Sequence, residues 1–514
     1  MDRQGKSDHI YNNTAIFSMA AVFLYTCIRA YSLSLVHDES LTYLLHVKAS
    51  FWEIITYGRG IRTNNHLLNT LLIKLFTYLF GISEFVIRTP ALIGHGLYLV
   101  GIYKILNLFL KRQSLLIGIL LLTLHPFMLD FFSCARGYSL GLGFLIFGIY
   151  YTFKRIGQDK PSQYSLIAIV FVFLSVLSHL SFVPIFLSMI CILALLESRD
   201  QISLIKQKQP AASIIKPLFK NFFLPVIILM SLLAVIYKGP IAKMKEAGEF
   251  AWEGVTYGFW KSTIASLIKV TLYNKDYFSS NLLFEIGLGI IILLIISLFV
   301  LFYRSKKKEF NLDNRYLLWI TLLLIICSLA VTLPVILFVG DYPTGRAAIY
   351  FIPIFLIFSL ILWKNFKFIQ IRSARILINI LSCLMTLVLL VHFAGCLNFT
   401  HYFMWKTDAD VKEMMKYLIE INKDKHLKDN SVRMGIHWIY DPCINFYKVR
   451  YGLRWLMWVD RGGFAGRKFD YYYYYDYTKN PIHNLKERQG MPQNIKIIKK
   501  FEVSNTCLAI PKEE

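Results

Sequence analysis

Residues 36–69 read VHDESLTYLLHVKASFWEIITYGRGIRTNNHLLN and begin where the first long apolar run of the chain stops. Their first carboxylates, Asp38 and Glu39, therefore lie at a predicted membrane–water boundary. Adjacent acids are costly to hold near hydrocarbon, so a chemical role is one reason to keep them there. The alternative is purely local, because acidic residues also suit the first turn of a helix.

The composition of the chain is that of a multi-pass membrane protein. Of its 514 residues 56% are hydrophobic, and long apolar runs recur along the sequence. A soluble core cannot bury so many of these runs, whereas a bilayer can. The polar N-terminus is not typical of a signal peptide, so we expect the first apolar run to be a retained anchor.

The net charge of +24 does not indicate a nucleic-acid-binding protein, because much of the excess falls in short clusters between apolar runs. Such clusters are typical of cytoplasmic loops and attract anionic membrane lipids. The clusters are Lys111-Arg112, Lys154-Arg155, Lys206 to Lys220, Arg304 to Lys308, and Lys364 to Arg375. The eight cysteines show no CxxC spacing that would predict a metal site.

The apolar runs predict an all-α membrane domain of about eleven transmembrane helices. Two further segments of the first external loop, Leu41–Tyr57 and Leu67–Phe80, are charged or short and are expected to lie in the interface or to be re-entrant. With this count every strongly basic loop falls on one side of the membrane. The predicted spans are Ile16–Val36, Arg88–Leu110, Ser114–Pro126, Leu140–Phe153, Tyr164–Ser178, Phe182–Leu196, Phe222–Tyr237, Leu282–Tyr303, Tyr316–Val339, Ala347–Trp363 and Ile376–Leu397.

Long apolar runs end near residue 397, which predicts a membrane domain over residues 1–397 and a small α+β domain over 398–514. Asp408–Ile421 has helical periodicity, and Ile495–Ile510 contains strand-like stretches. The aromatic run Tyr471–Tyr475 could stack on sugar rings, although core packing or anchoring at an interface is the stronger interpretation. The charge pattern puts the N-terminus in the cytoplasm and this second domain outside, with the protein in the plasma (inner) membrane.

The predicted topology gathers polar and charged residues at the outer face. Arginines there can bind a phosphate through paired hydrogen bonds, and a carboxylate near the apolar boundary can have a raised pKa and act as a base. A divalent cation between Asp38, Glu39 and His179 is conceivable, but the sequence does not require one. His66 and His179 can equally be hydrogen-bonded structural groups.

Four segments in chain order resemble the GT-C superfamily of polyprenyl-phosphate-sugar-dependent glycosyltransferases, in particular the bacterial relatives of protein O-mannosyltransferases and of the lipid A aminoarabinose transferase. The resemblance lies in HDES (37–40), NNHLLNTLLIKLFTYLFGISEFVIRTPALI (64–93), FSCARGYSLGL (132–142) and GRAAIYFIPIF (345–355). The chain departs from the family pattern in lacking prolines after His66 and in separating Arg346 from Tyr350.

The resemblance implies an inverting transfer of a sugar from a polyprenyl-phosphate carrier to an acceptor hydroxyl on the extracytoplasmic face of the membrane. It implies that Asp38 is the base and Glu39 its orienting or acceptor-binding partner. Because the carrier lipid supplies its own leaving group, no dissociable cofactor is required. The expected substrate- and phosphate-binding residues are Arg136 and Arg346, then Arg59 and Arg62, with His66, Tyr138 and His179.

Two other classes of function remain open from the sequence. A transporter or lipid-linked sugar flippase would also be a multi-pass protein, although it typically carries ionisable residues in mid-span rather than at loop mouths. A non-catalytic scaffold would use Asp38 only as a helix cap. The acceptor could be a lipid, a glycan or a protein.

Overall fold

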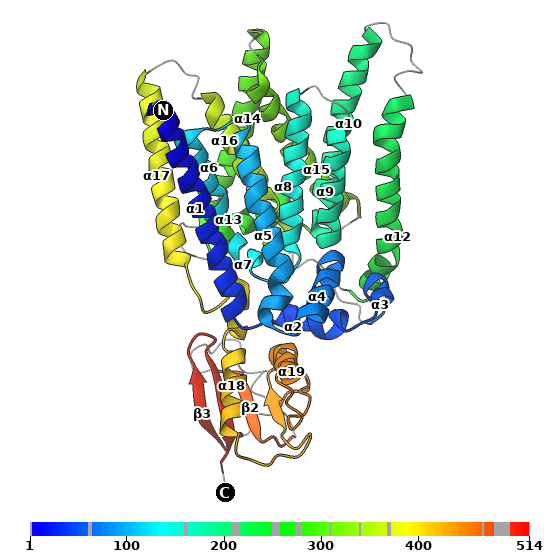
Figure 1. Cartoon of the computed structure of the whole chain (residues 1–514), viewed down its shortest axis with the longest axis vertical. Helices are drawn as coiled ribbons and strands as arrows, with labels where there is room; N and C mark the ends of the chain where they lie inside the picture. Colours follow the sequence, from blue (N-terminus) through cyan, green and yellow to red (C-terminus); the bar gives the residue numbers. More distant parts are fainter. Residues whose placement is uncertain are drawn as a thin grey trace.

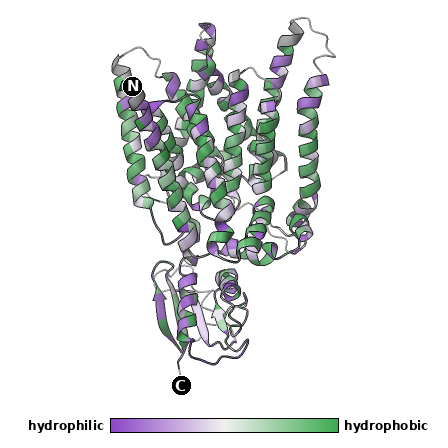
Figure 2. Cartoon of the chain, viewed as in Figure 1, coloured by the Kyte–Doolittle hydropathy of each residue, from purple (hydrophilic) through white to green (hydrophobic). Residues whose placement is uncertain are grey.

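A computed structural model describes most of the chain. The described residues are 3–59, 64–158, 163–206, 216–248, 258–273, 275, 277, 280–308, 310–338, 341–366, 372–464, 467–476 and 494–512. They form a long helical bundle with a smaller α+β unit at one end (Figure 1). Hydrophobic residues cover the length of the bundle, whereas hydrophilic residues gather at its ends and in the smaller unit (Figure 2).

Each predicted span coincides with a helix of the bundle. Shorter helices connect them at the bundle ends. The bundle helices are α1 (Arg3–Ser32), α5 (Glu84–Asn107), α6 (Arg112–Thr123), α8 (Tyr138–Gln158), α9 (Gln163–Ser178), α10 (Val183–Lys206), α12 (Leu224–Glu246), α14 (Ser280–Lys306), α15 (Leu312–Phe338), α16 (Phe351–Phe366) and α17 (Arg372–Cys396). The connecting helices are α7 (Pro126–Phe132), η2 (Leu180–Phe182), η3 (Phe219–Phe223), η4 (Trp260–Ala265), α13 (Ser266–Thr271) and η5 (Gly345–Ala348).

The all-α membrane fold is confirmed, but the number of crossings is not. Among the described residues, seven helices are long and apolar enough to cross a membrane, or eight if α6 and α7, bent by 67°, form one broken span. The helices α9 and α16 have only 16 residues each, which is below the roughly 20 residues that a perpendicular span needs. The N-terminus and the α+β unit lie at opposite ends of the bundle (Figure 1).

The first loop forms a layer of short helices between the bundle and the α+β unit (Figure 1). This layer contains α2 (His37–Leu41), the π-helix η1 (Thr42–Val47), α3 (Phe51–Thr56) and α4 (Leu67–Phe80). Ser50 and Glu53 start α3 with a capping box, and Gly81, with φ of 77°, ends α4. The prediction that Leu67–Phe80 is a separate short helix is therefore confirmed.

The part of the chain after α17, here called the C-terminal unit, is a four-stranded sheet with helices. Its sheet has the order β1-β2-β4-β3, with β1 parallel to β2 and the other pairs antiparallel. The predicted helix and strands are confirmed. The elements are η6 (Phe403–Asp408), α18 (Val411–Ile421), β1 (Met434–Ile436), η7 (Trp438–Tyr440), α19 (Asp441–Arg450), β2 (Tyr471–Tyr475), β3 (Ile495–Phe501) and β4 (Thr506–Pro511).

The tyrosine run Tyr471–Tyr475 is a central strand and not an exposed sugar platform. Tyr471 and Tyr473 pack into one hydrophobic cluster, and Tyr472 and Tyr474 pack into another on the opposite face of the sheet. This alternation follows from the period of two along a strand. Core packing is thus the role that the structure assigns to these rings.

Candidate active site

Helix α2 presents its two adjacent acids to different surroundings. Successive residues of a helix do not share a face, so Asp38 and Glu39 point apart. Glu39 is buried, with its side chain 0% exposed in an ion pair with Arg88 at 2.6 Å. Its oxygens also accept hydrogen bonds from the backbone N–H groups of Ala135 and Val36, at 2.6 and 3.0 Å. These partners occupy the carboxylate and leave Glu39 no open face toward a substrate.

Arg88 of α5 fixes α2 to the end of α1. Besides its two hydrogen bonds to Glu39, its guanidinium donates to the backbone carbonyls of Ala30, Leu33 and Ser34 at 2.7–3.2 Å. Ala30 lies in the last turn of α1, where carbonyls lack intrahelical partners, and Leu33 and Ser34 directly follow the helix, so one arginine binds the end of α1 and the chain that leaves it. Arg88 is therefore a structural residue that holds the loop carrying Asp38.

One turn earlier on α5, Glu84 makes the corresponding contacts to the C-terminal unit. It forms ion pairs with Lys412, at 3.1 Å, and with Arg450, and it accepts a hydrogen bond from the Tyr447 hydroxyl at 3.1 Å. The Glu84 side chain is 2% exposed. The N-terminal end of α5 thus binds the C-terminal unit through Glu84 and, one turn later, the loop that carries Asp38 through Arg88.

Asp38 lies among two arginines and an asparagine. Its Oδ2 atom is 3.2 Å from Arg136 Nη2 and 3.5 Å from Arg346 Nη1, and its Oδ1 accepts a hydrogen bond from Asn64 at 3.4 Å. Asn64 also accepts a hydrogen bond from Arg136 at 2.9 Å, which closes the group. The Asp38 side chain is 15% exposed, so it is reachable where Glu39 is not.

The pKa of Asp38 is lowered, contrary to the raised pKa expected for a carboxylate near hydrocarbon. Burial raises the pKa, but Arg136 and Arg346 favour the charged form and outweigh it, with smaller contributions from His37 and Asn64. Both arginines come from distant segments, so their distance to Asp38 was not accessible from the sequence. In this state Asp38 is ionised and paired.

A stack of aromatic rings adjoins the arginines. The rings of His66 and Tyr138 lie on either side of His179, with centroid distances of 4.0 and 3.9 Å. Both histidine Nε2 atoms are buried and lack a hydrogen-bond partner among the described residues. Burial, together with the charges of His179 and Arg136, keeps the pKa of His66 well below its usual range. Each of these nitrogen atoms thus has an unused hydrogen-bonding position.

Gly137 explains how Arg136 and Tyr138 reach this group from one tight turn. Its φ is 75°, and a Cβ atom at this position would lie 2.2 Å from the carbonyl oxygen of Ser178. Glycine is the residue that accepts both the left-handed backbone and this close approach. The turn brings Tyr138 against His179 and directs Arg136 toward Asp38.

The remaining predicted site residues are not part of this group. Arg59 is half exposed, donates to the Lys48 carbonyl at 3.2 Å and lies 3.9 Å from Glu53. Arg62 lies outside the described residues. No three His, Cys, Asp or Glu side chains of the described chain are grouped to hold a metal ion, and Glu39 is turned away from Asp38 toward Arg88. The conceived cation site at Asp38, Glu39 and His179 is therefore not assembled.

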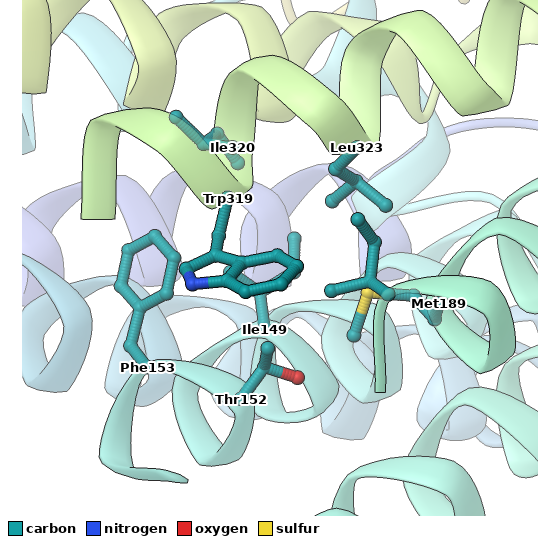
Figure 3. Close-up of a pocket in the computed structure, with 8 residues that line it drawn as sticks. Ile149, Thr152, Phe153, Met189, Trp319, Ile320 and Leu323 are labelled. Atoms are coloured by element: carbon teal, nitrogen blue, oxygen red, sulfur yellow. The ribbon is translucent and has the colours of Figure 1, made fainter. Parts of the chain in front are cut away.

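A separate small pocket lies between α8, α10 and α15, where Trp319 projects between side chains of the other two helices (Figure 3). Its lining is apolar except for Thr152, and it contains none of the predicted site residues. The polar group around Asp38 is therefore the candidate active site.

The segment Tyr402–Asp408 also contacts this site, although its sequence carries no motif that would have indicated a role. The Trp405 ring lies 5.5 Å from the Arg346 guanidinium carbon. The Tyr402 hydroxyl donates to the Ser133 carbonyl at 2.6 Å. Asp408 accepts a hydrogen bond from the His37 backbone N–H at 2.7 Å. Sequence reasoning missed these residues because they lie more than 300 positions from Asp38.

The bundle, its layer of short helices and the polar group at one end define a multi-pass membrane protein with a small α+β unit. Residues 67–229 match the family model described as dolichyl-phosphate-mannose-protein mannosyltransferase. This segment includes Arg136, Tyr138 and His179 but not Asp38. No curated protein sequence matches the chain significantly.

Solved structures of ArnT from Cupriavidus metallidurans resemble the whole chain. The apo structure has a TM-score of 0.51 and 9% sequence identity, with 97% of this chain and 98% of that chain covered. The structure bound to undecaprenyl phosphate has a TM-score of 0.48 and 10% identity, with 96% and 97% covered. The family match over residues 67–229 supports the predicted resemblance, and the apo ArnT structure shares the fold of the chain.

Proposed function

We propose that this protein is an inverting glycosyltransferase that moves a sugar from a polyprenyl-phosphate carrier to an acceptor hydroxyl, with Asp38 as the base. One observation carries the proposal: a partly exposed carboxylate shares one oxygen between Arg136 and Arg346 at the end of a membrane bundle. Two guanidinium groups at that depth suit the phosphate of a lipid whose tail lies in the bilayer. The dolichyl-phosphate-mannose named in the matching family has this chemistry.

The reaction follows from this arrangement. Asp38 accepts the proton of the acceptor hydroxyl, whose oxygen forms a new bond to the anomeric carbon. The bond between that carbon and the phosphate oxygen breaks on the opposite side, so the configuration inverts. The electron pair leaves with the polyprenyl phosphate, and Arg136 and Arg346 stabilise the charge that gathers there. His66 and His179 offer their unpartnered nitrogen atoms to the sugar or phosphate, beside Tyr138.

The two arginines serve both the base and the donor. In the free protein they hold Asp38 as a paired carboxylate with a lowered pKa. A donor phosphate between the same guanidinium groups neutralises part of their charge and weakens their hold on Asp38. Donor binding therefore raises the basicity of Asp38, so the base becomes effective when a sugar is present to be attacked.

Localisation and acceptor are part of the same proposal. We place the reaction on the extracytoplasmic side of the inner membrane, where the charge pattern puts the loop containing Asp38. Glu39 then acts by positioning α2 rather than by binding the acceptor, because Arg88 and two backbone N–H groups occupy its oxygens. The proposed chemistry uses no nucleotide, and it leaves the acceptor as a lipid, glycan or protein.

Purified protein incubated with a radiolabelled polyprenyl-phosphate sugar and an extract of acceptor-containing membranes tests this function. The expected result is transfer of label to an acceptor with release of polyprenyl phosphate, and a glycosidic bond of inverted configuration. Label that crosses the bilayer of a reconstituted vesicle without any transfer would instead favour a flippase.

Arg136→Gln is expected to lower the rate of sugar transfer about 10²-fold or more and to weaken donor binding, because a preorganised cation opposite the leaving phosphate is lost. Steady-state kinetics with varied donor measure both effects. Arg467→Gln removes an exposed arginine of the C-terminal unit that pairs with Asp460, and it should leave the kinetics unchanged. Equal kinetics for the Arg136 variant and wild type would remove Arg136 from the donor site.

The pH profiles of the two kinetic constants should differ. The base must be deprotonated, so activity falls as the pH drops through the pKa of Asp38. For kcat/KM toward the donor, which reports the free protein, we expect this fall below the pH range in which an ordinary aspartate titrates, because Arg136 and Arg346 lower that pKa. For kcat, which reports the donor complex, the fall should occur at a higher pH. Identical pH profiles for kcat and kcat/KM would contradict the proposal that Asp38 and the donor phosphate share the two arginines.

A further inference from the structure

We propose that Asp408 is a positioning residue for Asp38, through which the C-terminal unit sets the orientation of the proposed base. This inference rests on the proposed function for the role of Asp38. The contact itself can be tested without any assay of sugar transfer.

Asp408 completes the start of the helix that presents Asp38. The first backbone N–H groups of a helix have no intrahelical partners, and Val36, at the N-cap of α2, has no side chain that can accept a hydrogen bond. Glu39 accepts the Val36 N–H at 3.0 Å, and Asp408 Oδ2 accepts the His37 N–H at 2.7 Å. One of the two caps of α2 thus comes from a residue 371 positions away in the chain.

The His37 side chain makes a second contact with the C-terminal unit. Its Nδ1 atom lies 2.6 Å from the carbonyl oxygen of Ile439 in η7. The residue directly before Asp38 is therefore held on both its backbone and its side chain. With its backbone fixed there, α2 has little freedom to turn Asp38 away from the arginines.

Other residues of the same segment reach other parts of the site at intervals of three residues. Trp405 lies against Arg346, and Tyr402 donates to the Ser133 carbonyl three residues before Arg136. The segment Tyr402–Asp408 therefore contacts the three chain segments that carry Arg136, Arg346 and Asp38. Its placement supports a positioning role rather than that of a simple connector.

Asp408 is buried, 1% exposed, next to groups that affect its charge. Its pKa is raised to about 7, because burial and the nearby charges of Asp38 and Glu39, which raise the pKa, outweigh the His37 N–H, which lowers it. Cys443 and Tyr473 also face it. A buried carboxyl of this kind is costly to keep, and capping α2 is a reason to keep it.

Three variants test the inference: Asp408→Ala, Asp408→Asn and Asp410→Ala. The amide oxygen of Asn can still accept the His37 N–H, whereas Ala cannot. Asp410 is the matched control, because it is also a buried aspartate that accepts a backbone N–H, from Ser504 at 2.7 Å, but inside the C-terminal unit. The readouts are kcat, KM for the donor, and hydrogen–deuterium exchange of the peptide that covers α2.

For Asp408→Ala we expect kcat to fall about ten-fold, as for loss of a helix cap, with KM for the donor within about two-fold of wild type. Exchange at the start of α2 should become faster. Asp408→Asn should have the kcat of wild type and the wild-type exchange rate at α2. Asp410→Ala should lower the unfolding temperature but change neither kcat nor the exchange at α2.

Wild-type kcat and wild-type exchange in Asp408→Ala would overturn the inference, and so would an equal loss in Asp408→Asn. If the wild-type protein transfers no sugar, the proposed function fails on its own account. The exchange rate of α2 then still decides whether Asp408 holds that helix.

Discussion

Asp38→Asn should lower the rate of sugar transfer by about 10²–10⁴-fold while the protein stays folded and binds its donor. Asparagine has the shape of aspartate and can still accept hydrogen bonds from Arg136 and Arg346, but it cannot take up the acceptor proton. Because the two arginines lose their counter-charge, donor affinity should stay the same or increase. Single-turnover transfer of a radiolabelled sugar and donor binding to the same preparation measure the two effects separately.

The control for this substitution is Asp460→Asn, which neutralises an exposed carboxylate in the C-terminal unit. It should leave the rate of transfer unchanged. Full activity in Asp38→Asn would falsify the assignment of Asp38 as the base. Loss of both transfer and donor binding would also contradict it, because the proposed base is not required for binding.

Glu39→Ala should destabilise the protein by about 3–5 kcal/mol, because it leaves Arg88 buried without its counter-charge. The Arg88 side chain is 0% exposed, so water cannot replace the missing carboxylate without a rearrangement. Two backbone N–H groups, those of Ala135 and Val36, lose their acceptor at the same time. Thermal unfolding in detergent, followed by tryptophan fluorescence, measures the loss.

The double variant Glu39→Ala/Arg88→Met separates the charge from the packing. It removes both charges and keeps an apolar side chain of similar length in place of Arg88. If the unpaired charge dominates, the double variant should be more stable than Glu39→Ala alone, so the two substitutions will not be additive. An unfolding temperature of Glu39→Ala equal to that of wild type would show that the buried pair contributes little.

The sequence located the helices of the bundle because each is a continuous apolar run, and it separated Leu67–Phe80 from the long runs by its short length and by the charge pattern of the loops. It did not determine how many helices cross the bilayer. The helices α9 and α16 are short, and α6 and α7 meet at a bend of 67°, so crossing depends on packing and tilt. These are properties of the assembled bundle.

The candidate site was predicted in part for a similar reason. Asp38, Arg136 and Arg346 were expected from their place at loop mouths and from the family resemblance, and the structure brings both arginines within 3.5 Å of Asp38. The pKa of Asp38 is lowered and not raised as expected, because the direction of the shift depends on the distances from Asp38 to arginines that are remote in the sequence. Glu39 was grouped with Asp38 by adjacency, yet neighbours on a helix point apart, and this could have been recognised from the sequence.

The N-terminal end of α5 has a mechanical consequence. Glu84 binds the C-terminal unit and Arg88 binds the loop with Asp38, and the two residues are four positions apart on one rigid helix. Any tilt of α5 in the bilayer would therefore move both attachments together. The C-terminal unit and the proposed base would then keep their mutual alignment in bilayers of different thickness.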